Sequence, residues 1–283
     1  MSKITGSVAT SHIPGIGNAI AKNLQQAPYW KPFFDGFIPA REWLARNTPD
    51  VVVVVYNDHG LNFFLDKMPT FAIGAAHLYA SEDEGWGIPT VPPLKGDPAL
   101  SWAIIEGVVQ DEFDVTTCQE MLVDHAVTIP LQLLWPEGPP PVRIVPIAVN
   151  TVQHPLPSPA RCLKFGQSIG RAIEAYAPAL RVLVVSSGGL SHQLEGERAG
   201  FINPQFDALC LNSLINEPEK LTGYTTLEIV EKAGSQGAEI LNWIAGRGIV
   251  QGETREVLRN YHIPISNTAS ALQILEPAGD LVL

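Results

Sequence analysis

Cysteine is scarce in this 283-residue chain, and Cys118, Cys162 and Cys210 are widely spaced without a CxxC pair. Three scattered cysteines exclude a disulfide framework and a structural zinc site built on thiolates. No apolar run approaches the roughly 20 residues that a membrane span requires, and the N-terminal segment lacks the apolar block of a signal peptide. We therefore expect a cytoplasmic protein whose cysteines are reduced thiols.

Positive charge is also in short supply. The chain has 18 Lys and Arg residues against 29 Asp and Glu residues, a formal net charge of -11, and no cluster of basic side chains. Binding to nucleic acid requires such clusters, so this class of function is excluded. With 46% hydrophobic and 17% charged residues, the composition is that of an ordinary globular protein, and no long helix-length apolar segment points to a membrane.

Three short segments are rich in Val and Ile and end in small or polar residues: "VVVVVYNDHG" (51–60), "VRIVPIAVN" (142–150) and "RVLVVSSGG" (181–189). Such segments are typical of strands buried on both faces of a sheet. Between them, residues 161–178 have helical periodicity, and Pro- and Gly-rich stretches at 84–98 and 135–141 predict loops. The pattern predicts an α/β fold, with one domain over residues 1–283 and a central mixed, largely parallel sheet flanked by helices.

Four of the seven histidines stand where an apolar or small-residue segment meets a turn. They are His12 in "ATSHIPG", His59 in "YNDHG", His125 in "MLVDHAVTIP" and His192 in "SSGGLSHQ". A single histidine in such a place is more often a hydrogen-bonded core residue than a ligand. Because ligands of open α/β sheets bind beyond the carboxyl ends of the strands, four such residues indicate one shared site.

A carboxylate that could join these histidines is Glu239, in a predicted helix over 227–248 that is interrupted near Gly234 to Gly237. It follows two small residues and shares a helix face with Trp243, which favours burial, although an exposed glutamate remains an alternative. Two imidazoles and one carboxylate suit iron(II), with open positions for substrate and oxygen. The same ligands around zinc would leave room for a nucleophilic water, so ligand type alone does not distinguish an oxygenase from a hydrolase.

Nine strings in this order resemble the catalytic β subunits of the protocatechuate 4,5-dioxygenases, within the class III extradiol dioxygenase family. They are "TSHIPGIG", "VYNDH", "PTFAIG", "DEGWG", "DEFD", "VDH", "GGLSHQLEGERAGFIN", "GSQGAE" and "YHIPISNTA". The resemblance covers nearly the whole chain. The sequence departs from the family's motif at Ala126, which follows His125 where glycine is expected. This difference bears on the backbone conformation of the loop at His125.

The resemblance implies a role for each candidate residue. His12, His59 and Glu239 would bind Fe(II), His192 would be the catalytic acid and base, and His125 would lie near a substrate hydroxyl or the oxygen. Three further residues would support the metal ligands or contact the ring substituent of the substrate: Asn57, Ser266 and Asn267. His77, His154 and His262 lack such a setting and are assigned no role.

The implied activity is Fe(II)-dependent extradiol cleavage of protocatechuate with O2, giving 4-carboxy-2-hydroxymuconate semialdehyde in the catabolism of lignin-derived aromatic compounds. Gallate or 3-O-methylgallate is an alternative substrate, and a zinc-dependent hydrolase or a non-catalytic relative is an alternative of another class. The family also implies a small α subunit, separate or fused, that covers the active site. Because no fused copy follows Leu283, we expect a separate subunit in an α2β2 heterotetramer.

Overall fold

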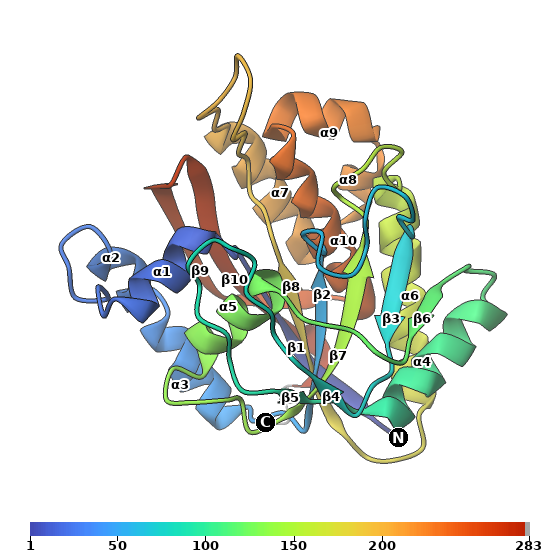
Figure 1. The fold of residues 1–283 in the computed structure, drawn as a ribbon. Helices are drawn as coiled ribbons and strands as arrows, with labels where there is room; N and C mark the ends of the chain where they lie inside the picture. Colours follow the sequence, from blue (N-terminus) through green and yellow to red (C-terminus); the bar gives the residue numbers. More distant parts are fainter. Residues whose placement is uncertain (281–283) are drawn as a thin grey trace.

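The computed structural model describes residues 1–280 and forms one α/β unit around an eight-stranded sheet (Figure 1). The helices are α1 (Pro14–Ala21), α2 (Lys31–Asp35), α3 (Ile38–Arg46), α4 (Pro98–Gln110), α5 (His125–Leu134), α6 (Pro159–Ala175), α7 (Pro204–Asn216), α8 (Glu219–Thr222), α9 (Thr226–Ala233) and α10 (Ile240–Ile249), with 3-10 turns η1 (Gln236–Glu239) and η2 (Ala278–Asp280). The strands are β1 (Lys3–Thr10), β2 (Val51–Tyr56), β3 (Phe71–Gly74), β4 (Leu78–Tyr79), β5 (Leu94–Lys95), β6 (Thr116–Cys118), β7 (Arg143–Val149), β8 (Arg181–Ser187), β9 (Thr254–Ile265) and β10 (Thr268–Pro277).

The sheet has the order β6-β3-β7-β2-β8-β1-β10-β9, and β4 and β5 form a separate two-stranded ribbon. The central strands β7, β2, β8 and β1 are parallel, whereas the β9–β10 hairpin is antiparallel to β1 at one edge and β3 is antiparallel to β7 near the other. The predicted mixed, largely parallel sheet is therefore confirmed. Within the predicted loop over 84–98, the structure places the short strand β5, which pairs with β4.

The run of five valines lies at the centre of this sheet because it is covered on both sides. Val51, Val53 and Val55 belong to the core beneath α4, α6 and α10, whereas Val52 and Val54 belong to the core beneath α1, α3 and α5. Successive side chains of a strand point to opposite faces, so a strand between two helical layers must be apolar at every position. Figure 1 shows α1, α2 and α3 to one side of the sheet and α4 and α6 to the other.

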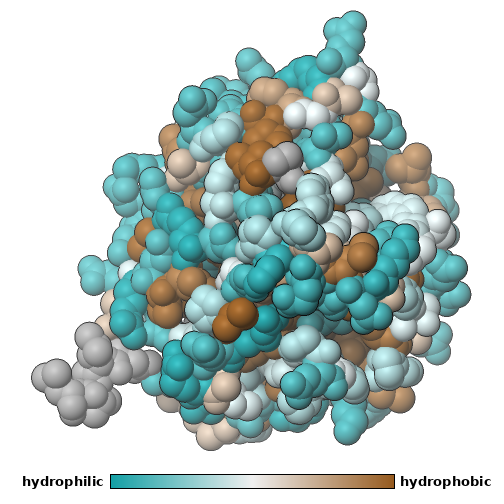
Figure 2. All heavy atoms as spheres, turned by 90° about the vertical axis from the view of Figure 1, so that its left-hand side faces the viewer, coloured by the Kyte–Doolittle hydropathy of each residue, from teal (hydrophilic) through white to brown (hydrophobic). Residues whose placement is uncertain are grey.

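The outer surface over α1 to α3 is mostly hydrophilic, with apolar patches that are separated from one another (Figure 2). Among residues 1–280, no helix combines the length and the apolar character needed to cross a membrane.

The predicted helix over 227–248 is divided in two, as its glycines indicated. α9 ends at Ala233, and the chain resumes as η1 and α10. Gly234, which follows α9, has a φ of 90°, in the left-handed region that favours glycine. Glu239 stands at the junction of η1 and α10. Its position therefore depends on how α10 packs.

Helix α10 packs directly on α6 through glycines. A Cβ atom at Gly166 would lie 1.9 Å from the carbonyl oxygen of Ala245, and one at Gly248 would lie 2.4 Å from the carbonyl oxygen of Leu163. Both obstacles are backbone atoms, which cannot move aside as a flexible side chain can.

Gly166→Ala should therefore push the two helices apart. We expect the free energy of unfolding to fall by about 3 kcal/mol, at the upper end of the range for overpacking, as measured by urea denaturation. Gly223→Ala is the matched control, because Gly223 is exposed and its nearest obstacle is 3.5 Å away. A stability of Gly166→Ala equal to that of the control would contradict this packing.

Candidate active site

Three adjacent parallel strands deliver histidines to the same edge of the sheet. His12 follows β1, His59 follows β2, and His192 follows β8, and the spatial order of these strands is β2-β8-β1. His125 joins them from the first position of α5, and Glu239 joins them from the start of α10. Together they line a cavity of about 540 Å³ whose other lining residues are Ile13, Pro14, Gly15, Asn57, Trp86, Thr151, Val152, Gly189, Leu194, Ser235, Gln236, Ser266 and Thr268.

The carboxylate of Glu239 is the centre of this cluster. Its Oε1 atom lies 3.3 Å from Nε2 of His12 and 3.7 Å from Nε2 of His59, and its Oε2 atom lies 3.9 Å from Nε2 of His192. Burial by itself would raise the pKa of Glu239, but His12 and His59 hold that pKa well below its ordinary value. The carboxylate is thus buried and ionised, a state that requires positive partners.

Each of the four histidines has its Nδ1 atom committed to a hydrogen-bond acceptor. The acceptors are Asp124 Oδ2 for His59 at 3.0 Å, Leu190 O for His192 at 2.8 Å, Glu84 Oε1 for His125 at 2.8 Å, and Ser187 Oγ for His12 at 2.8 Å. The Ser187 hydroxyl donates its only hydrogen to the carbonyl of Ala126, so towards His12 it can only accept. In its neutral form, each of these imidazoles therefore carries its proton on Nδ1 and has its lone pair on Nε2. The Nε2 atom of His59 lies 3.2 Å from Nδ2 of Asn57, which can donate to it.

The charge balance around His59 marks a place for a cation. Burial alone would lower the pKa of His59, but hydrogen bonds and the charges of Asp124 and Glu239 raise it to about 10. Burial alone would raise the pKa of Asp124, but its contacts with His59 lower it to about 2. The acids on both sides of this ring therefore favour a positive charge at His59, and a divalent ion bound at Nε2 would also supply one.

The side chains present fit a divalent first-row metal ion. When metal bonds are 2.0–2.2 Å long, neighbouring ligand atoms lie about 3 Å apart, so the observed separations of 3.3 and 3.7 Å around Glu239 Oε1 need to close only slightly. Nε2 of His125 is buried and has no hydrogen-bond partner among the described residues. Two neutral imidazoles and a carboxylate form the donor set of iron(II) sites that keep positions open, and zinc accepts the same ligands.

Spacing of side-chain ligand atoms gives two groups of potential metal ligands within residues 1–280, and neither contains Glu239. One is His12, His59 and His125, and the other is His59, Glu84, Asp124 and His125. In the second group, the carboxylates of Asp124 and Glu84 already accept hydrogen bonds from the Nδ1 atoms of the two histidines and from their backbone N–H groups. These two acids orient imidazoles and are not free to bind a metal themselves.

The remaining predicted residues occupy different places. Asn57 donates from Nδ2 to Glu239 Oε1 at 3.2 Å, and its Oδ1 accepts from Asn242 at 2.9 Å, so it braces the central carboxylate. Ser266 lines the cavity, but Asn267 is not among the lining residues; both have positive φ values in the exposed turn between β9 and β10. His77, His154 and His262 lie outside the cavity lining.

Sequence reasoning missed the side chains that orient the histidines, above all Asp124, Ser187 and Glu84. Asp124 caps the N-terminus of α5, where Oδ1 accepts from Ala126 N, while its Oδ2 atom holds His59. An aspartate directly before a histidine at the start of a predicted helix is the available signal for this residue. Glu84 lies in the string "DEGWG", which contributed to the family resemblance without indicating a role for this residue, and Ser187 has no comparable signal.

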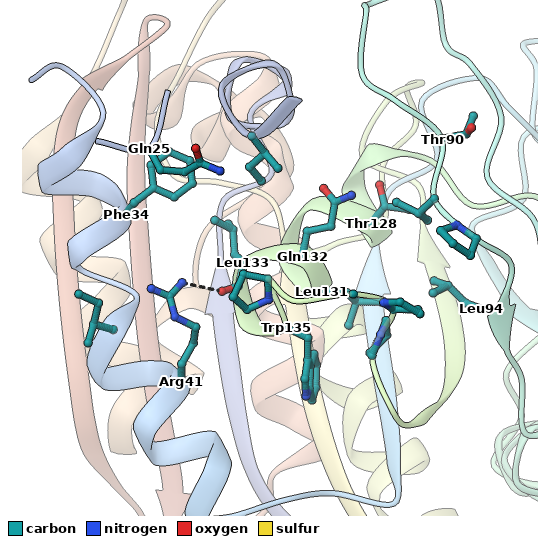
Figure 3. A pocket seen from close by; sticks show the side chains of 18 of the residues that line it. Gln25, Phe34, Arg41, Thr90, Leu94, Thr128, Leu131, Gln132, Leu133 and Trp135 are labelled. Atoms are coloured by element: carbon teal, nitrogen blue, oxygen red, sulfur yellow. Dashed lines mark hydrogen bonds between the residues drawn. The ribbon is translucent and has the colours of Figure 1, made fainter. Parts of the chain in front are cut away.

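A second cavity of about 530 Å³ lies beside α3 and α5 (Figure 3). Its walls include Phe34, Leu131 and Trp135, and the guanidinium of Arg41 donates to the carbonyl of Leu133 at 3.1 Å. Asp35 is the only acidic residue in this lining, which contains no histidine or cysteine. This second cavity lacks the ligands for metal chemistry, so the histidine-lined cavity is the candidate active site.

Asp124→Asn should weaken metal binding by about 10–100-fold, because an amide has one acceptor oxygen and no negative charge to hold the His59 imidazole. The affinity of the purified variant for Zn(II) can be measured by competition with a chromophoric chelator. Asp97→Asn is the matched control: Asp97 is also a buried N-cap, at the start of α4, but it pairs with Arg143 away from the cavity. Equal affinities of the two variants would contradict the role given to Asp124.

Comparisons with known proteins identify the family of this chain. A family model described as the catalytic LigB subunit of aromatic ring-opening dioxygenase matches residues 6–271. The chain is 40% identical over 195 residues to a gallate dioxygenase of Pseudomonas putida, an alignment that covers 69% of this chain but only 57% of that protein. It is 31% identical to a 2,3-dihydroxyphenylpropionate/2,3-dihydroxicinnamic acid 1,2-dioxygenase of Rhodococcus jostii, with 74% of this chain and 78% of that protein covered.

A crystal structure of an uncharacterized protein from Escherichia coli K12 has the same fold, with a TM-score of 0.57, 13% identity, and coverage of 95% of this chain and 99% of that one. At this identity, the likeness concerns the fold alone. The family match spans nearly all of the described residues, and the histidine cluster lies within it. The chain therefore belongs to the LigB family of catalytic subunits of aromatic ring-opening dioxygenases.

Proposed function

We propose that this chain catalyses Fe(II)-dependent extradiol cleavage of a carboxylated catechol. The observation that carries the proposal is the convergence of three Nε2 atoms, from His12, His59 and His192, within 3.9 Å of the buried carboxylate of Glu239. In this proposal His12, His59 and Glu239 hold the iron, and the family supports a ring-opening dioxygenase over the zinc hydrolase that the same ligands would allow.

Gallate is the substrate named for the relative that is 40% identical to this chain. The resemblance of sequence motifs suggested protocatechuate, but the relative at 40% identity is named a gallate dioxygenase, and this supports the trihydroxylated ring more directly. Both compounds carry a ring carboxylate and adjacent hydroxyls, so the same site would receive either. We therefore propose gallate first, with protocatechuate and 3-O-methylgallate as further candidates.

When bound, Fe(II) would supply one centre at which the catechol oxygens and dioxygen are held side by side for reaction. His192 would accept a proton from the catechol and return it later, because its Nδ1–H is fixed by Leu190 O and its Nε2 faces the cavity side of Glu239. Asn57 would keep the carboxylate of Glu239 in place by donating to Oε1. His125 would support a substrate oxygen through its unpartnered Nε2.

The substrate carboxylate lacks a cationic partner in this cavity. Among the described lining residues there is no lysine or arginine, and Ser266 is a neutral donor. The cavity lining also includes exposed apolar side chains, with Trp86 at 46%, Val152 at 52% and Leu194 at 52% of full exposure. Apolar exposure around a polar site marks a surface that another chain would cover. We propose a separate small α subunit at this position, within an α2β2 assembly.

His192→Phe should leave iron binding nearly intact while reducing kcat by at least about 100-fold, because the residue moves protons and does not hold the metal. Glu239→Ala removes the anionic ligand and should yield metal-poor protein. Iron content after anaerobic reconstitution and purification separates the two effects. Equal iron loss in His192→Phe and Glu239→Ala would show that the roles are assigned wrongly.

Oxygen uptake tests the proposed function directly. The Fe(II)-reconstituted chain should consume dioxygen when gallate is the substrate. The rate of oxygen uptake with protocatechuate, compared with the rate with gallate, shows which of the two acids is preferred. Zinc-loaded protein serves as the inactive control. Absence of uptake with any of these catechols, together with hydrolytic activity of the zinc form, would replace the dioxygenase with a hydrolase.

The partner can be tested with the chain alone and co-expressed with a candidate small subunit. We expect tighter substrate binding and a larger particle in size-exclusion chromatography when the partner is present, because it covers the apolar rim and completes the pocket. Full activity and tight binding by the isolated chain would refute the need for a second subunit and indicate a self-sufficient homo-oligomer.

A further inference from the structure

His125 presents an unsatisfied nitrogen to the cavity. Only 2% of the residue is exposed, it lines the cavity, and its Nε2 atom has no hydrogen-bond partner among the described residues. Its ring lies 4.2 Å from that of His59 and 5.2 Å from that of His12, measured between centroids. A buried polar atom without a partner is costly, so its place beside the candidate metal ligands indicates a group that a ligand satisfies.

The carboxylate of Glu84 holds His125 at its Nδ1 atom and at its backbone N–H. Oε1 accepts from Nδ1 at 2.8 Å and Oε2 accepts from the backbone N–H at 2.9 Å, and only 11% of the Glu84 side chain is exposed. An ionised carboxylate accepts hydrogen bonds and cannot donate them. The proton of the neutral His125 ring must therefore lie on Nδ1, which makes Nε2 a hydrogen-bond acceptor.

Glu84 belongs to a loop that is fastened to a second element. The carbonyl of Trp86 accepts from Asn18 Nδ2 in α1 at 3.1 Å, and the Trp86 ring lies 4.9 Å from the His125 ring. Gly85 and Gly87, on either side of Trp86, have φ values of 78° and 72°, which favour glycine. The loop thus holds Glu84 against His125 while placing an indole ring at the edge of the same cavity.

We propose that Glu84 is a positioning residue that keeps the proton of His125 on Nδ1, so that Nε2 accepts a hydrogen bond from a hydroxyl of the bound aromatic substrate. The inference rests on the proposed function for the identity of the ligand. A phenolic hydroxyl has the hydrogen that the bare nitrogen requires, and the bond would orient the ring over the metal ligands. The carboxylate would orient the imidazole, and the imidazole would accept a hydrogen bond from the hydroxyl, as in a catalytic triad.

Glu84→Gln tests this role because it conserves shape and removes one acceptor. The glutamine side chain has one oxygen for two donors, the His125 backbone N–H and Nδ1–H. If the oxygen takes the backbone N–H, the amide NH2 faces Nδ1 and favours the tautomer protonated on Nε2. The acceptor that the substrate hydroxyl needs is then lost.

The tautomer can be read from 15N chemical shifts of histidine-labelled, zinc-loaded protein, with His125→Gln used to assign the resonances. In the unmodified protein, we expect a protonated Nδ1 and an unprotonated Nε2 on His125. Glu84→Gln should shift this population towards Nε2–H and lower kcat of the iron-loaded protein by about 10–100-fold, with metal content retained. Glu82→Gln, the same change at an exposed acid in the same loop, should alter neither the spectrum nor kcat.

Three results would overturn the proposal. They are a proton on Nε2 of His125 in the unmodified protein, an unchanged tautomer and kcat in Glu84→Gln, and a loss of metal from Glu84→Gln as large as that from Glu239→Ala, which would make Glu84 a ligand. Absence of oxygen uptake by the unmodified protein would refute the proposed function separately. In that case, the spectra would still decide whether Glu84 sets the tautomer.

Discussion

The burial of one ionised carboxylate, that of Glu239, is the constraint on which the rest of the site depends. A carboxylate removed from water must be compensated by donors and positive charge. Gly189 N donates to it at 2.9 Å and Asn57 Nδ2 at 3.2 Å, and three imidazoles face it through Nε2. In the proposed function, a divalent cation between this carboxylate and the imidazoles would supply the positive charge that the burial of Glu239 requires.

The fold brings these groups together by two separate means. Adjacent parallel strands bring His12, His59 and His192 to one edge of the sheet, because the carboxyl ends of parallel strands share that edge. Glu239 comes instead from a helix, and the contact of α10 with α6 through Gly166 and Gly248 sets how deeply that helix sits. The geometry of the proposed metal site therefore depends on helix packing as much as on the sheet.

The features that could be predicted from the sequence are those set by local patterns. The valine run indicated a strand buried on both faces, and Gly234 to Gly237 indicated the break before Glu239. The orienting groups could not be predicted in this way. His59 is 65 residues from Asp124 and His125 is 41 residues from Glu84, so these pairs arise only from tertiary structure. The hairpin of β9 and β10 and the N-terminal helices α1 to α3 were also not predicted from periodicity.

The sequence also could not show which side chain of a turn lines the cavity. Ser266 and Asn267 are neighbours in sequence, yet only Ser266 is among the residues lining the cavity. Both residues have positive φ values, and the side chains of successive turn residues leave the backbone in different directions. A motif therefore identified the correct turn, but it could not determine which of its side chains reaches the cavity.

The three proposed metal ligands determine how this site would work. A crystal structure of the Fe(II)-loaded protein, with anomalous diffraction measured at the iron edge, tests their identity most directly. We predict one strong anomalous peak bonded to Nε2 of His12, Nε2 of His59 and a carboxylate oxygen of Glu239, with His192 and His125 near the metal but not bonded to it. A peak bound by His125 or Glu84 in place of Glu239, or no peak in this cavity, would contradict the account.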